Sequence, residues 1–199
     1  MTDLWGAGAS TTWQAALDAY HAVVAGQGVA KLAELDEWYR NALPALLAAR
    51  STPHATRAEL VRVTEWKMYR GVWRAPNLVR VKGNDADLVH ATSARALALV
   101  PHPSKPVKEL ATLDGVGPAT ASAITAAFAP STYAFFDELV AAQIPALGPV
   151  AWTLGYYAKY AEALRSRAGE LGGDWTPVML ERALWANVGG KAGYSSVSN

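Results

Sequence analysis

Two glycines separated by a single residue constrain this chain more than any other local feature. They stand in the run Leu-Asp-Gly-Val-Gly-Pro at residues 113–118, between a short helical pattern and an alanine-rich one. Glycine permits the positive φ of a tight turn and leaves no side chain between the backbone and a partner. Val116 can pack back between the two helices, so the run predicts a fixed hairpin with an open backbone.

The helix that follows the hairpin is expected to offer free backbone amides. Pro118 suits the first helical position, where its missing N–H costs nothing. Amides at a helix start carry partial positive charge and suit a phosphate oxygen. A contact of this kind holds a nucleic-acid backbone and reads no base. The residues expected to make it are Gly115, Val116, Gly117, Ala119 and Thr120.

The rest of the chain also favours helices. Ala and Leu are abundant and alternating β-branched runs are missing, which predicts an all-α fold. We expect one helical domain over residues 1–190, with the hairpin at 105–128, and a flexible polar tail over 191–199. Helices are expected over about 12–25, 31–50 (kinked at Pro44), 56–70, 76–82, 85–99, 105–112, 118–128, 138–142, 150–171 and 177–189, with Asn84, Asp137 and Thr176 as caps.

Composition excludes several classes of site. The chain has no cysteine, which excludes disulfides, thiolate zinc sites and iron–sulfur clusters. No apolar run reaches the roughly 18–20 residues that cross a membrane, and the first residues lack a signal-peptide pattern. We therefore expect a cytoplasmic protein with no membrane partner. No metal site is expected, because metal-ligand spacing is missing from the four histidines, His21, His54, His90 and His102.

Positive charge is concentrated in one part of the sequence. The net charge is only +1, yet residues 54–108 hold ten Lys or Arg and four Asp or Glu. Such a stretch can form a one-sided surface that faces phosphates. If the hairpin were absent, a set of solvated helix faces would explain this concentration of positive charge equally well.

The aromatic residues fall into two groups. Aromatic side chains dominate core burial, so those at helical spacing among apolar neighbours are expected in the core: Trp13, Trp38, Trp152 and Trp185. Those that lie among cations are different, and they are Trp66 and Trp73, beside Lys67, Arg70 and Arg74.

The hairpin resembles a known family. Residues 113–121, LDGVGPATA, are similar to the helix-hairpin-helix of the endonuclease III-like (HhH-GPD) DNA glycosylase superfamily, whose pattern reads approximately LPGVGxKTA. That superfamily has a catalytic Asp 24 residues after the first Leu, and Asp137 stands 24 residues after Leu113. The resemblance implies the HhH-GPD fold, with helical lobes around a cleft, and Asp137 as the catalytic carboxylate. Asp137 also suits a plain helix N-cap, and the two interpretations are compatible.

The resemblance covers about residues 105–142, and the flanking helices fit it in kind and order. A weaker likeness to a small branch of the same superfamily is carried by residues 65–71 and 175–185. Ala119 stands where bifunctional members have the lysine that forms a Schiff base, which implies a monofunctional enzyme that uses water. The family also allows a monovalent cation on the hairpin carbonyls; no other cofactor is expected.

A glycosylase flips the nucleotide out of the stack and needs side chains that line a base pocket and fill the gap. The segment 65–74 is the candidate for both, through Trp66, Lys67, Tyr69 and Trp73, with Arg70 and Arg74 as phosphate partners. The alternative is an amphipathic helix with a snorkelling cationic face. Phe136 and Glu138, beside Asp137, are further pocket candidates.

The sequence thus predicts a monomeric, monofunctional DNA glycosylase that excises a damaged or modified base from duplex DNA and leaves an abasic site. Repair and defence against modified foreign DNA both remain open. The base stays open too, because distant segments build the pocket. One alternative is a non-catalytic DNA-binding protein on the same scaffold, and another is a helical protein–protein module whose hairpin is only a turn.

Overall fold

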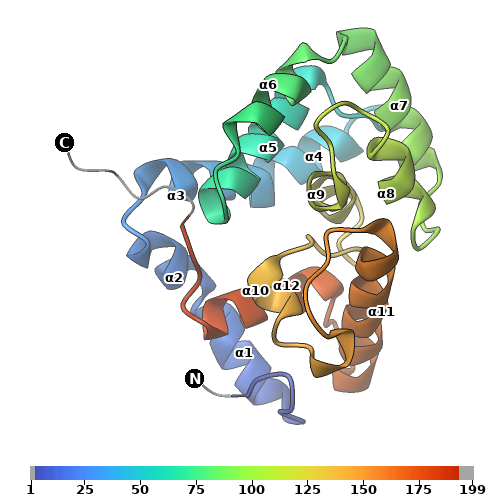
Figure 1. Cartoon of the computed structure of the whole chain (residues 1–199). Coiled ribbons are helices and arrows are strands. Elements are labelled where there is room, and N and C mark those ends of the chain that lie inside the picture. The colour runs from blue at the N-terminus through green and yellow to red at the C-terminus, as the bar shows by residue number, and fades with distance from the viewer. Residues whose placement is uncertain (1–2, 193–199) are drawn as a thin grey trace.

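Helices are the only regular secondary structure in residues 3–192, the part of the chain that the computed structural model describes (Figure 1). This confirms the predicted all-α fold. None of the helices in this part has the length and apolar character that crossing a membrane requires. In chain order the elements are α1 (Ser10–Asp18), α2 (Tyr20–Gly26), α3 (Ala30–Glu37), the π-helical turn η1 (Trp38–Ala42), α4 (Leu43–Ala48), α5 (Arg57–Arg70), α6 (Ala75–Gly83), α7 (Ala86–Ala98), α8 (Lys105–Leu110), α9 (Pro118–Phe128), α10 (Glu138–Ala141), the 3-10 turn η2 (Pro145–Leu147), α11 (Leu154–Leu171) and α12 (Pro177–Asn187).

Two groups of helices form the body of the molecule (Figure 1). In the first, α9 packs against α4, α5 and α8. In the second, α12 packs against α1, α2, α10 and α11, so the first and last helices are neighbours. Small Ala, Ser and Thr side chains let the neighbours approach α9 closely, and all its residues from 119 to 127 are buried.

Pro44 interrupts the long helix predicted over 31–50. Because proline has no N–H, the ladder of hydrogen bonds cannot continue through it. The helix is interrupted by the π-helical turn η1, which lies between α3 and α4. The predicted helix over 12–25 is likewise divided, at Ala19, into α1 and α2.

Asp137 and Thr176 cap α10 and α12 as predicted. The prediction that Asn84 caps the following helix is wrong, because Asp85 caps α7 through the amides of Asp87 and Leu88. Asn84 is buried, and it accepts a hydrogen bond from Asp114 N at 3.0 Å and donates one to Asp114 O at 2.9 Å. It therefore ties the end of α6 to the glycine hairpin.

The core contains Trp13 and Trp185, as predicted, and Trp38 is partly buried against it. The prediction is wrong for Trp152, whose residue is 46% exposed. This residue lies in the loop before α11, outside the apolar face of that helix. Of the tail predicted over 191–199, Lys191 forms an ion pair with Glu138 at 2.9 Å, while residues 193–199 lie outside the described residues.

Candidate functional site

The hairpin between α8 and α9 needs glycine at its first position for two reasons. Gly115 has φ +72°, in the left-handed region that side chains disfavour. A Cβ there would also lie 2.7 Å from Asn77 O and 2.8 Å from Arg80 Cβ. The hairpin is therefore pressed against α6, while Val116 is buried as predicted and holds it from the other side.

Gly117 agrees with one part of its prediction and not with the other. Its φ of −93° is accessible to any residue, and a Cβ would meet nothing within 4 Å. The expected positive φ is therefore wrong at Gly117, whereas the flank without a side chain is present as predicted. No side chain caps α9, and Pro118 occupies its first turn. The amides of Ala119 and Thr120 have no acceptor within the helix, because the first turn of any helix leaves its N–H groups unpaired.

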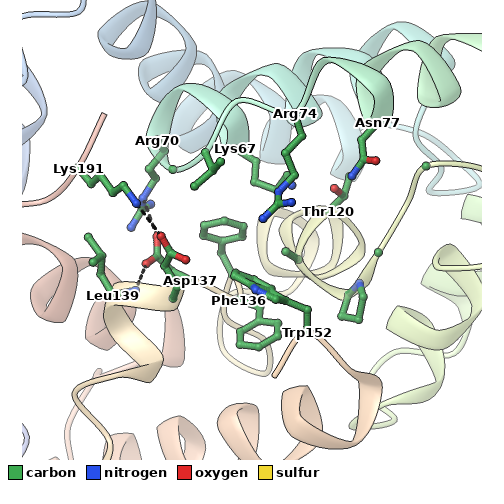
Figure 2. Close-up of a pocket in the computed structure, with 18 residues that line it drawn as sticks. Lys67, Arg70, Arg74, Asn77, Thr120, Phe136, Asp137, Leu139, Trp152 and Lys191 are labelled. Carbon is green, nitrogen blue, oxygen red and sulfur yellow. Dashed lines mark hydrogen bonds and ion pairs between the residues drawn. The ribbon is translucent and has the colours of Figure 1, made fainter. Parts of the chain in front are cut away.

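A pocket of about 290 Å³ opens beside this hairpin. Its volume is near the lower end of the range of ligand pockets, about 300–1,000 Å³. The start of α9 forms one wall, the end of α5 and the connection to α6 form another, and Asp137 lies between them (Figure 2). The lining residues used below are Lys67, Arg70, Val72, Arg74, Asn77, Gly117, Ala119, Thr120, Phe136, Asp137, Glu138, Trp152 and Lys191.

Asp137 lies at the start of α10 and lines the pocket although it is only 6% exposed. Its Oδ1 accepts hydrogen bonds from Leu139 N at 2.8 Å and Val140 N at 3.4 Å, so Oδ2 is the atom left for other partners. Burial raises the pKa of the Asp137 carboxyl to about 6, and the positive charge of Arg70 opposes that rise. The carboxyl is therefore mostly ionised at pH 7.

Arg70 is a buried partner of this carboxylate and not the surface phosphate ligand that the sequence predicted. Its side chain is 1% exposed, and its Nε lies 3.5 Å from Asp137 Oδ2. The same guanidinium donates to Glu181 through Nη2 and to Tyr20 Oη at 3.3 Å, and it lies 4.6 Å from the ring centre of Trp185. These contacts fix it beneath the pocket, where DNA cannot reach it.

Behind Arg70 the buried charges alternate in sign. Glu181, with a fully buried side chain, also accepts from Arg40 Nη2 at 3.2 Å, and Arg40 Nε lies 3.7 Å from Asp36. Burial is the main reason why the pKa of Asp137 is raised in spite of Arg70, and the negative charge of Glu181 adds to the rise.

The structure brings together the two segments that carry the weaker resemblance, because Arg70 belongs to 65–71 and Glu181 to 175–185. Glu181 was not among the predicted site residues. A signal was present, since Glu181 stands on an apolar helix face beside Leu180 and Leu184. A charge in that position needs a buried partner.

Lys67 and Arg74 form a cationic wall of the pocket (Figure 2). Lys67 is half-buried, and burial lowers the pKa of its amine to about 8, with the charge of Arg74 adding to the effect. Arg74 is exposed, as a phosphate partner must be. Among the ion pairs of the described residues, none involves either side chain.

Three aromatic residues contribute to the apolar part of the pocket, namely Phe135, Phe136 and Trp152. The ring centres of Phe136 and Trp152 lie 4.9 Å apart, and both residues line the cavity (Figure 2). Phe136 was a predicted pocket residue and Trp152 was not. Because Phe136 is otherwise packed against tyrosines of α11, its ring is held in place from behind.

The prediction of Trp66 as a pocket residue is wrong. Its ring is fully buried and stacks on Tyr39 at 3.6 Å, and its Nε1 donates to Asp36 at 2.8 Å. Tyr69 and Trp73 lie near each other, with ring centres 5.1 Å apart, and neither lines the pocket. Of the four predicted residues of segment 65–74, the structure places Lys67 alone in the cavity wall.

Glu138 lines the pocket as predicted, and its charge is paired with Lys191. No group of three or more possible metal-binding side chains occurs within residues 3–192. At the hairpin, the Leu113 carbonyl accepts from Val116 N and that of Asp114 from Asn84. The monovalent cation at these carbonyls stays a prediction, and no chemical step below uses it.

Comparison of the chain with protein-family models, with curated proteins and with solved structures found no match.

Proposed function

We propose that this protein is a monofunctional DNA glycosylase with an HhH-GPD-type fold, which excises a damaged or modified base from duplex DNA and leaves an abasic site. The observation that carries the proposal is one of position. Asp137 and the open start of α9, which the resemblance names as catalytic group and DNA contact, line the same pocket. They lie on separate elements, so their spacing along the chain does not by itself place them together.

The proposed role of Asp137 is electrostatic stabilisation of the transition state. Breaking the bond between C1′ and the base leaves positive charge on the sugar, which a fixed carboxylate stabilises. With a pKa of about 6, Asp137 is ionised at neutral pH and can also take a proton from the attacking water. The amides of Leu139 and Val140 hold its Oδ1, so Oδ2 is the atom that would face the reaction.

The hairpin would hold the DNA backbone next to the flipped nucleotide. The amides of Ala119 and Thr120 suit a phosphate oxygen, and the missing side chain at Gly117 lets the strand approach. Arg74 lies on the pocket rim, and the exposed Arg80 adjoins Gly115. Arg80 would contact a phosphate beside the hairpin, while Arg74 faces the pocket, so binding should weaken as salt increases.

Val72 is the side chain best placed to fill the gap that a flipped base leaves. It is an apolar residue, 41% exposed, at the edge of the pocket between Gly71 and Trp73. Apolar side chains inserted between base steps are a common means of unstacking DNA. Val72 thus takes the role that the sequence assigned to the larger aromatic residues of the same segment.

Water is the proposed nucleophile, because Ala119 offers only a methyl group at the hairpin position where bifunctional members have an amine. The test is incubation with duplexes that each carry one damaged or modified base, followed by alkali to cleave at abasic sites. Alkali-dependent cleavage at the modified position of at least one duplex is expected. Duplex binding without cleavage of any substrate would instead assign the scaffold to a non-catalytic DNA-binding protein.

A further inference from the structure

The charges that line the pocket are distributed unevenly. Both carboxylates already face a cation, since Asp137 lies beside Arg70 and Glu138 is paired with Lys191. Lys67 and Arg74, on the opposite wall, face no carboxylate of the described residues within 4 Å. Figure 2 shows the side chains of Lys67 and Arg74 above Phe136. Their charges are therefore left for a ligand.

Trp152, which is 46% exposed, gives this cavity an aromatic surface on which a base can stack, and the buried Phe136 packs against its ring. Stacking on an aromatic ring is tolerant, because every base has a π-face. The Trp152 ring would therefore accept many bases, and selection between bases falls to the polar groups. Amine and guanidinium groups only donate hydrogen bonds, so they recognise acceptors such as carbonyl oxygens.

We infer that this site selects a neutral base that carries carbonyl oxygens and leaves as an anion held by Lys67 and Arg74, and that it discriminates against cationic alkylated bases. The inference rests on the proposed function and names its substrate class. A base that is already cationic would be repelled by the two side chains. Since it leaves as a neutral molecule, it would also gain nothing from them in the transition state.

The step balances as a hydrolysis. The C1′–N bond breaks and both its electrons go to the base nitrogen, so negative charge spreads onto the carbonyl oxygens near Lys67 and Arg74. The water oxygen forms a bond to C1′, and its proton passes to Asp137. The released base then takes up a proton from solvent, and Asp137 gives its own proton back to solvent.

The test compares three duplexes of one sequence, which carry uracil, hypoxanthine or 7-methylguanine at the same position. For each, the rate with the full-length protein is divided by the rate of spontaneous base loss. Greater acceleration for uracil or hypoxanthine than for 7-methylguanine supports the inference. Greater acceleration for 7-methylguanine overturns it and leaves the proposed function standing. If all three duplexes stay intact, the inference falls, while the wider panel of modified bases decides the proposed function.

The variant Lys67→Met removes one charge and keeps most of the side-chain volume. Because loss of one donor to a developing anion costs roughly 100- to 1,000-fold in rate, acceleration on the neutral base should fall by about that factor. Acceleration on 7-methylguanine should stay level or rise. An equal loss on both bases would overturn the inference, since it would indicate a general structural role. Lys159→Met, an exposed lysine of α11, is the matched control.

Discussion

Arg70 Nε lies 3.5 Å from Asp137 Oδ2, and the same guanidinium donates a hydrogen bond to Glu181. Arg70 is thus shared by two buried carboxylates, one in the pocket and one behind it. Because Arg70 is also paired with Glu181, it does not fully neutralise Asp137. The Asp137 carboxylate is therefore held in a fixed orientation, yet its ionisation remains costly.

Asp137 should make the folded protein less stable above pH 6. The pKa of Asp137 in the folded protein, about 6, exceeds the ordinary value of 3.8. The contribution of Asp137 to the free energy of unfolding is therefore most favourable below pH 3.8 and is lost as the pH rises through 6. The loss amounts to roughly 3 kcal/mol, at about 1.36 kcal/mol per pKa unit. Asp137→Asn should therefore unfold at higher denaturant concentration than wild type at pH 8. This gain should vanish at pH 4, and a gain of equal size at both pH values would contradict the assignment.

Glu181→Gln should destabilise the protein and change how its rate depends on pH. Removing one partner of a buried ion pair costs about 3–5 kcal/mol, because Arg70 and Arg40 lose their shared counterion. The negative charge of Glu181 raises the pKa of Asp137, so the rise of the excision rate with pH should begin at lower pH in the variant. Denaturant titration and a pH–rate profile measure the two effects.

The exposed Glu162→Gln is the matched control for this variant, since a surface change of this kind costs within about 0.5 kcal/mol. A Glu181→Gln protein with reduced stability and an unmoved pH profile would show that Glu181 acts on the fold alone.

The two hairpin glycines should respond differently to substitution. Gly117→Asp has room for its side chain, so the fold should survive while duplex affinity falls through repulsion of the phosphate. The loss should be roughly 10- to 100-fold, because hydrogen bonds to charged groups contribute about 1.5–3 kcal/mol. Fluorescence anisotropy with labelled duplex and circular dichroism measure the two properties. Unchanged affinity with an intact helical spectrum would exclude the hairpin as the DNA contact.

Gly115→Ala should instead damage the fold. Its positive φ costs about 1–3 kcal/mol for a residue with a side chain, and the new methyl would collide with Asn77 O. Thermal unfolding should shift clearly downward for this variant and hardly at all for Gly117→Asp. The reverse order would contradict the geometry of the hairpin.

The features that the sequence predicted well are those set by neighbouring residues. The hairpin and the cap at Asp137 depend on spacings within a few positions, and both occur as expected. The ion pair of Arg70 with Glu181 joins residues 111 positions apart, so it follows from packing that no local pattern encodes. The excess cations of segment 65–74 predicted a wall of a pocket, and Lys67 and Arg74 do line the pocket, but the predicted aromatic residues of the segment do not.

The errors within that segment have a geometric cause. Successive residues of a helix point about 100° apart, since one turn holds about 3.6 residues. Trp66 and Arg70 are four positions apart and share the inner face of α5, whereas Lys67 faces the pocket. The cationic pattern located the right helix end, but only tertiary packing decides which face is buried. Trp152 was missed for a related reason, because it lies just outside the helix in which its spacing had placed it.

The product should be an intact strand with an abasic site. A lyase needs an amine that attacks C1′ and forms a Schiff base, and Ala119 supplies none at the hairpin. Borohydride should therefore trap no covalent protein–DNA adduct, and strand cleavage should appear only after alkali. A strong adduct that disappears in Lys67→Ala would show that Lys67, on the facing wall, attacks the sugar, and the monofunctional assignment would be wrong.

The most direct measurement of the central claim is the single-turnover excision rate of Asp137→Asn beside that of wild type, on a duplex from which wild type excises the base. The substitution keeps the shape and the bond from Leu139 N while it removes the charge that stabilises the sugar. The account predicts that excision falls to the background of spontaneous base loss, with duplex affinity equal to or above that of wild type. Excision near the wild-type rate would contradict it, because Asp137 would then not be the catalytic carboxylate.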